Sequence, residues 1–151
     1  AYATFASGGK YCKPIAIDQI LDASGTSMAV PSADCTQVMD QGAADETAKT
    51  LRATSEPGGT AKDAVFGRPI AGKTGTTDEA ENTWFVGFTP QLSTAVWIGD
   101  ATESGRSLVG RTIGGVYFPE IYGSDLAVPM WRDYMSQAVA NDPALPIPSH
   151  G

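Results

Sequence analysis

The chain is 151 residues long, with a formal net charge of −7 at pH 7 and a sequence pI of about 4.5. This acidity argues against a nucleic-acid partner and does not favour binding to anionic lipid. Apolar residues make up 42% of the sequence, enough for the core of one domain. No apolar run approaches the roughly 18 residues that a membrane-spanning helix needs, so we expect no direct membrane contact from this chain.

The amino-terminal part predicts a short helix followed by a hairpin. Residues 2–7 indicate the end of a helix, which the glycine pair Gly8-Gly9 stops. Apolar residues alternate with polar ones over residues 14–22, which predicts a strand. Residues 23–26 form a turn, and residues 28–30 return as the second strand.

The middle of the chain predicts a helix and then a sheet. Residues 41–55 favour a helix with Asp40 as its N-cap. Residues 70–77, 84–89 and 93–99 are strand-like runs in close succession, which predicts a three-strand antiparallel meander.

The last part predicts a loop-rich segment over residues 100–122 and a helix over residues 128–140. In this helix Trp131, Met135 and Val139 recur every four residues. Residues 142–151 contain three prolines and predict a tail or linker. We therefore expect an α+β fold, an antiparallel sheet packed with helices, in a domain over residues 1–141.

The most informative motif is Lys73-Thr74-Gly75-Thr76-Thr77, which combines a cation, hydroxyls and a glycine. On a strand, Lys73 and Gly75 share one face, and Thr74 and Thr76 share the other. The ammonium group attracts an anionic substrate terminus, the hydroxyls donate to a carboxylate, and the glycine leaves room for a ligand. The motif alone is weak, because a turn or solvated loop also accounts for it.

Several further segments match one family in order and spacing, and together they resemble class A, bifunctional penicillin-binding proteins. K-T-G is one of the signatures of these proteins and of serine β-lactamases. The matching segments are residues 2–11 (YATFASGGKY), 67–77 (GRPIAGKTGTT), 83–90 (TWFVGFTP), 94–99 (TAVWIG), 113–115 (IGG) and 128–135 (VPMWRDYM). The resemblance is to the carboxyl-terminal half of the transpeptidase domain.

This resemblance implies part of a serine D,D-transpeptidase that crosslinks peptidoglycan stem peptides and is acylated by β-lactams, without a cofactor. Lys73 is then the catalytic cation near the serine, and Thr74 and Thr76 contact the carboxylate of the donor peptide or β-lactam. Gly75 permits that approach. The Thr76 backbone N–H is half of the oxyanion hole, and the N–H of the nucleophilic serine is the other half.

Two motifs of the family are missing from the sequence. No asparagine follows a serine at the S-x-N spacing. The run from Ser7 to Lys10 satisfies S-x-x-K, but two glycines would cost the required helix about 1 kcal/mol each, so we reject Ser7 as the nucleophile. We expect both motifs upstream, in the same polypeptide or in a separate chain. The fold is then incomplete without that portion, and the isolated chain is inactive.

Two alternatives remain open from the sequence. One is a non-catalytic interaction or regulatory fragment that keeps the fold without a nucleophile. The other, weaker one is a fragment of a serine β-lactamase. A second polypeptide that carries S-x-x-K and S-x-N would favour the transpeptidase over the non-catalytic fragment.

The chain contains two cysteines, Cys12 and Cys35, which bracket the predicted hairpin. Disulfides persist outside the cytoplasm, where an enzyme that builds the wall acts. We expect an extracytoplasmic location, a parent protein anchored to the cell membrane, and a bond between the two cysteines. The alternative is a pair of buried free thiols, and nothing in the spacing suggests zinc.

Other residues receive a structural interpretation. We expect Trp84, Phe85, Trp97 and Trp131 to form a core between helix and sheet rather than a sugar platform. The acidic residues Asp78, Glu79 and Glu81 predict a solvated loop rather than a metal site. The single histidine, His150, lies in the predicted tail, which excludes a Ser-His-Asp triad within this chain. Three arginines are interpreted as ordinary surface charges: Arg106, Arg111 and Arg132.

Overall fold

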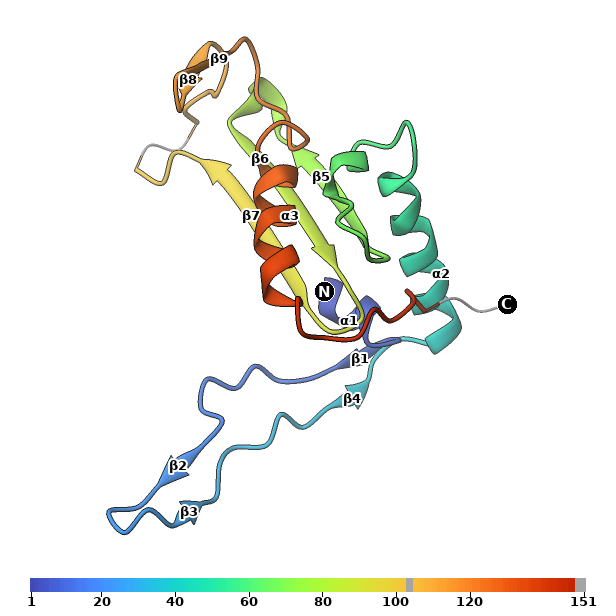
Figure 1. Ribbon diagram of the computed structural model, residues 1–151, viewed down its shortest axis with the longest axis vertical. Helices are drawn as coiled ribbons and strands as arrows, with labels where there is room; N and C mark the ends of the chain where they lie inside the picture. The colour runs from blue at the N-terminus through green and yellow to red at the C-terminus, as the bar shows by residue number, and fades with distance from the viewer. Residues whose placement is uncertain (103–104, 149–151) are drawn as a thin grey trace.

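The computed structural model describes residues 1–102 and 105–148, so His150 lies outside the described residues. Figure 1 shows a sheet with helices against it and a long two-stranded arm that projects away. The first elements are α1 (Tyr2–Ala6), β1 (Lys10–Tyr11), β2 (Ile20–Leu21), β3 (Ser27–Met28), β4 (Thr36–Gln37), α2 (Gln41–Arg52) and the 3-10 turn η1 (Ala53–Ser55). The later ones are η2 (Lys62–Ala64), β5 (Ala71–Thr76), η3 (Asp78–Ala80), β6 (Asn82–Phe88), β7 (Ser93–Gly99), β8 (Arg111–Ile113), β9 (Val116–Phe118) and α3 (Ala127–Ala138). This is the α+β fold that the sequence predicts.

The central sheet is an antiparallel meander in the order β5-β6-β7. Its register pairs Lys73 with Val86 and Val86 with Ala95, and Thr74 with Phe85. The predicted meander is confirmed, with strand ends that differ from the prediction by at most two residues. In this order β5 is an edge strand of the sheet.

One face of the sheet is covered by α3, as Figure 1 shows. The rings of Phe85 and Trp131 meet edge to face with their centroids 5.1 Å apart, and both side chains are fully buried. The indole N–H of Trp131 donates to the backbone carbonyl of Thr94 at 3.1 Å. Met135 packs in the same cluster, one turn further along the helix. These contacts form the main core.

On the opposite face, α1 and α2 pack at the end of the sheet where β5 begins and β6 ends. There Ala71 and Phe88 pack with Ala48 of α2 and with side chains of α1. Further along this face Trp84 and Trp97 are 41% and 39% exposed, with ring centroids 6.2 Å apart. The prediction that all four aromatic residues are core is therefore wrong for these two, because alternation places them on the face that α3 does not cover.

The helix predicted over residues 41–55 is confirmed as α2 followed by η1. Asp40 is its N-cap, and its Oδ1 accepts from the backbone N–H of Ala43 at 3.1 Å. The 3-10 turn brings Thr54 against the sheet, where its hydroxyl donates to the carbonyl of Gly72 at 2.8 Å. The edge strand β5 thus meets η1 along its open edge, and α2 packs against the face that carries Ala71.

The arm, residues 10–37, differs from the predicted hairpin. The expected strand over residues 14–22 is wrong except at Ile20–Leu21, and its partner is Ser27–Met28 instead of residues 28–30. No residue of the arm is buried. Without a third strand or a packed face, an isolated two-stranded ribbon is only marginally stable, so regular pairing is confined to short pieces.

A disulfide joins Cys12 and Cys35 at the base of the arm, with their Cα atoms 4.0 Å apart. The predicted bond is therefore present, and the alternative of two buried thiols is wrong. Beside it, Lys13 donates to Asp34 Oδ2 at 2.9 Å, and the Lys13 backbone N–H donates to the carbonyl of Ala33 at 2.6 Å. These contacts fix the two halves of the arm to each other next to the β1–β4 pair.

The segment predicted as loop-rich contains a small hairpin, β8 and β9, with Arg111 opposite Phe118. Its two-residue turn is Gly114-Gly115, and both glycines have positive φ. Such turns favour glycine because its backbone adopts positive φ without steric cost. The glycine pair between two apolar runs was a sequence signal that could have predicted this hairpin.

The segment after residue 141 lies against the domain. Arg68 donates to the carbonyls of Asp142 and Pro143 at 2.6 and 3.1 Å, and Ile147 is buried in the cluster around Phe88. The division of the chain at residue 141 stays a prediction. In the part of the chain that the structure describes, no helix has the length and apolarity to cross a bilayer.

Candidate active site at the edge of the central sheet

The motif residues Lys73, Thr74, Gly75 and Thr76 form the second part of the edge strand β5. Lys73 and Thr76 are exposed, and Thr74 and Gly75 are half-buried. The register places Lys73 and Gly75 on the face of Trp84, and Thr74 and Thr76 on the face covered by α3. The structure therefore brings the four predicted site residues together on one accessible strand.

Backbone groups of β5 alternate between β6 and the open edge. The N–H of Thr77 donates to the carbonyl of Asn82 at 3.0 Å, so residue 77 faces the neighbouring strand. The carbonyls of Gly72 and Thr74 instead accept from side chains, from Thr54 Oγ1 at 2.8 Å and Lys73 Nζ at 2.9 Å. Because successive residues alternate, the N–H of Thr76 is directed to the open edge.

The edge is covered at one end and accessible at the other. Thr54 of η1 covers the strand at Gly72, and Thr60 reaches Thr74, whose hydroxyl donates to Thr60 Oγ1 at 2.9 Å. Beyond this point the ammonium of Lys73 and the N–H of Thr76 lie on the same edge. A cation and a backbone donor side by side are suited to an anionic ligand or a developing oxyanion.

Gly75 has no packing reason to lack a side chain. A Cβ built there would lie 3.5 Å from Trp84 Cβ, which is an ordinary contact distance. At Gly72, by contrast, a Cβ would lie 2.7 Å from the carbonyl oxygen of Val86. The missing side chain at Gly75 is therefore consistent with room for a ligand rather than with a need of the fold.

A second segment reaches the motif from 47 residues away, and the sequence did not point to it. The backbone N–H of Gly123, between β9 and α3, donates to Thr76 Oγ1 at 3.3 Å. The contact joins segments that are distant in sequence, and no local pattern around Gly123 signals it. This glycine is the site residue that sequence reasoning missed.

The turn after the motif is fixed by its own polar contacts. The Asn82 N–H donates to Thr77 Oγ1 at 2.9 Å, and Ser107 donates to the carbonyl of Glu79 at 2.7 Å. Asp78 and Glu79 are exposed, as expected of a solvated loop, whereas Glu81 is half-buried after the 3-10 turn η3. Within residues 1–102 and 105–148 no group of three histidine, cysteine or acidic residues is placed to hold a metal ion.

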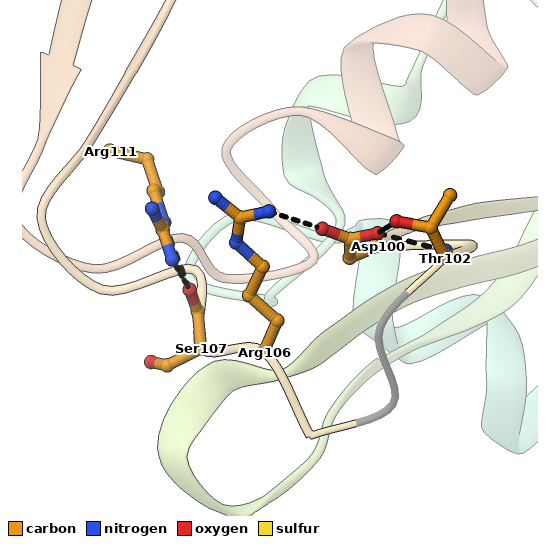
Figure 2. Close-up of polar contacts among 5 residues, drawn as sticks. All are labelled: Asp100, Thr102, Arg106, Ser107 and Arg111. Carbon is orange, nitrogen blue, oxygen red and sulfur yellow. Dashed lines mark hydrogen bonds and ion pairs between the residues drawn. The ribbon is translucent and has the colours of Figure 1, made fainter.

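A polar cluster follows β7 and is drawn in Figure 2. Asp100 accepts from Arg106 at 2.9 Å and from the backbone and hydroxyl of Thr102. Arg111 is half-buried and donates from Nε and Nη2 to the carbonyl of Ser107 at 3.0 and 2.8 Å. A cavity of about 300 Å³ lies here, lined by residues of the 99–113 segment and not by the motif. Arg111 is thus a loop-bracing residue, contrary to the prediction of an ordinary surface charge.

The S-x-x-K pattern at Ser7 and Lys10 is not built like a nucleophile and its base. The helix α1 ends at Ala6, and Gly8 and Gly9 have positive φ. The Ser7 hydroxyl donates to the carbonyls of Thr4 and Lys10. Ser7 and Lys10 therefore do not share a helix, as the two glycines predict.

The fold is that of known penicillin-binding proteins. The crystal structure of penicillin-binding protein 1A from Haemophilus influenzae matches 97% of this chain and 27% of its own, with a TM-score of 0.72 and 22% identity. The apo structure of penicillin-binding protein 3 from Mycobacterium tuberculosis matches 98% of this chain and 35% of its own, with a TM-score of 0.66 and 20% identity. At such identities the likeness shows the fold alone.

Sequence comparison identifies the family. The model of the penicillin binding protein transpeptidase domain matches residues 1–113. Penicillin-binding protein 1A of Aquifex aeolicus is 36% identical over 136 residues, which cover 89% of this chain and 17% of that protein. Penicillin-binding protein 1A of Neisseria meningitidis is 36% identical over 145 residues, covering 92% and 17%. The chain belongs to the penicillin-binding protein transpeptidase domain family, which confirms the family predicted from its motifs.

The chain spans about one sixth of the length of these curated relatives. Family membership therefore concerns the transpeptidase domain.

Proposed function

We propose that this chain is part of a serine D,D-transpeptidase that crosslinks peptidoglycan stem peptides and is acylated by β-lactams. In this proposal the chain supplies the K-T-G strand and half of the oxyanion hole, and another portion of the domain supplies the nucleophile. The observation that carries the proposal is the accessible end of β5, where Lys73 and the outward N–H of Thr76 share one edge. Family membership supports the same reaction class.

Each motif residue has a task in this reaction, and Thr76 has two. Lys73 attracts the carboxylate of the donor peptide to the edge of β5 and stabilises it by charge. The Thr74 and Thr76 side chains contact that carboxylate, and Gly75 leaves the space in which the ligand lies against the strand. The Thr76 N–H donates to the carbonyl oxygen as it becomes negative, and removing such a donor typically costs about 3–4 kcal/mol of activation free energy.

The covalent step needs the other portion of the domain. A serine hydroxyl attacks the donor carbonyl, its proton passes through the lysine of S-x-x-K to the leaving nitrogen, and the donor's terminal residue leaves as the amine. An acceptor amine then attacks the ester and loses a proton, the new amide bond forms the crosslink, and the serine oxygen leaves and takes up the proton. That portion, with S-x-x-K and S-x-N, lies in the same polypeptide or in a separate chain. The isolated chain is inactive for lack of it, and the enzyme acts on the cell-wall side in a protein anchored to the membrane.

The test is the rate of acylation by benzylpenicillin in the complete transpeptidase. We expect Lys73→Ala to lower this rate by about ten- to a hundredfold, the effect of losing a charge-assisted contact. Lys49→Ala is the matched control, because Lys49 is an exposed lysine of α2 that pairs with Glu46, and it should acylate like wild type. A wild-type rate for Lys73→Ala would show that β5 is only a structural strand.

A further inference from the structure

The contact between Gly123 and Thr76 links the segment before α3 to the candidate site. Gly123 is buried, and its N–H donates to Thr76 Oγ1 at 3.3 Å. The Thr76 side chain is otherwise exposed at the end of β5. This contact from outside the motif therefore bears directly on a hydroxyl with an expected role in carboxylate binding.

Hydrogen bonds on the side of α3 hold Gly123 in position. Its carbonyl accepts from the backbone N–H of Val128 at 3.0 Å, in the first turn of α3. The preceding residue, Tyr122, donates its N–H to Asp125 Oδ2 at 2.7 Å, and the Asp125 N–H returns to the carbonyl of Tyr122 at 3.0 Å. Ile121 is fully buried just before them. The donor that meets Thr76 is thus held by hydrogen bonds within its own segment and to the start of α3.

Space, rather than backbone conformation, requires glycine at position 123. It is not among the glycines with positive φ. A Cβ built on it would clash with the carbonyl oxygen of Trp84 and would lie 3.1 Å from that of Gly75 and 3.2 Å from Thr74 Cβ. Two of these neighbours are backbone atoms of the sheet, which cannot rotate away. A side chain at this position must push the 121–125 segment away from β5.

The hydrogen bond also decides how the Thr76 hydroxyl is oriented. A hydroxyl carries one hydrogen to donate and two lone pairs to accept. Thr76 uses a lone pair for Gly123, so its hydrogen is left for another acceptor. Thr74, in contrast, donates its hydrogen to Thr60. The two threonines are therefore not equivalent, and Thr76 is the better donor to a carboxylate.

We propose that Gly123 is a positioning residue that holds the Thr76 hydroxyl as an acceptor, so that its hydrogen points to the substrate carboxylate. The proposal rests on the function proposed above and adds a residue outside the K-T-G motif. It predicts that Gly123 affects ligands with a free carboxylate more than ligands without one, because charge-assisted hydrogen bonds are about twice as strong as neutral ones.

The experiment compares acylation of the complete transpeptidase by benzylpenicillin and by its methyl ester, which lacks the free carboxylate. We expect Gly123→Ala to slow acylation by benzylpenicillin about tenfold and acylation by the ester less than about twofold. Asp125→Ala introduces no clash and only loosens the turn that orients Gly123. It should shift the ratio of the two rates in the same direction, which keeps the test valid if Gly123→Ala does not fold.

A double-mutant cycle separates positioning from general damage. Thr76→Val removes the hydroxyl, so adding Gly123→Ala to it should change the rate ratio less than about twofold, whereas adding it to Thr76→Ser should have the full effect. Equal slowing of both ligands in every background would overturn the inference and leave the proposed function intact. Absence of acylation by benzylpenicillin in the wild-type transpeptidase would instead reject the proposed function.

Discussion

The sheet body (β5, β6 and β7 with α2 and α3) and the arm (residues 10–37) are held together in different ways. In the body, Phe85, Trp131 and Met135 are fully buried between sheet and helix. In the arm no residue is buried, and Ile15, Ile17 and Met28 are about half exposed. A disulfide and an exposed ion pair hold the base of the arm.

The comparison teaches that strand-like sequences have different outcomes with and without a packing partner. Apolar runs give continuous seven-residue strands in β6 and β7, where a helix covers one face. In the arm the alternation of apolar and polar residues gives two-residue strands, because burial of apolar surface is the main source of stability and the arm buries little. Covalent linkage replaces burial as the constraint on the two halves of the arm.

The largest expected effect is on the body. Trp131→Ala should lower the free energy of unfolding by about 3–5 kcal/mol, because it empties the centre of the core and removes the hydrogen bond to Thr94. Urea unfolding followed by circular dichroism measures it. Tyr134→Ala on the same helix is the control, since its side chain is 54% exposed, and it should change the free energy by less than about 0.5 kcal/mol. Equal effects of the two variants would contradict the assigned core.

The next effect concerns the arm alone. Replacing Cys12 and Cys35 together by serine should abolish hydrogen-exchange protection of the Lys13 and Asp22 N–H groups, which bond across the arm. It should lower the free energy of unfolding of the body by less than about 1 kcal/mol, because the arm contributes little to the core. If the arm folded together with the body, the chain-entropy model would give a loss of about 3 kcal/mol instead. Such a loss in urea unfolding would contradict the separation of the two regions.

The smallest effect is a change in a pKa at the base of the arm. The hydrogen bond from Lys13, and a second one from Ser32, hold the pKa of Asp34 below its ordinary value. The ion pair therefore stabilises the arm at pH values above the ordinary pKa of aspartate. This contribution is lost as the pH falls through the lowered pKa of Asp34. We expect Lys13→Ala to raise the pKa of Asp34, as measured by an NMR titration of the side-chain carboxyl group.

Asp22 is the internal control for this titration. Its pKa is lowered by the hydroxyl of Ser24 first, and then by backbone groups of the turn that include the N–H of Thr26. Lys13 takes no part in these contacts, so the pKa of Asp22 should stay the same in Lys13→Ala. A parallel rise of both pKa values would mean that the variant unfolds the arm rather than removing one ion pair.

The sequence by itself determined the parts of this protein that depend on local pattern. The meander, the N-cap at Asp40 and the helix around Trp131 follow from periodicity and capping, which act over a few residues. The motif from Lys73 to Thr76 is contiguous, so its residues share one strand once that strand forms. The family was also readable, because several motifs occur in a fixed order.

Only the tertiary structure decided which face of each element is covered. The sequence does not show that α3 lies over Phe85 and leaves Trp84 and Trp97 exposed, because both faces of the strand carry large aromatic residues. Nor does it show that the arm extends without a partner, since alternation predicts a strand whether or not a second surface is present. The contact of Gly123 with Thr76 spans 47 residues, and it exists only because α3 and the sheet fix both segments in space.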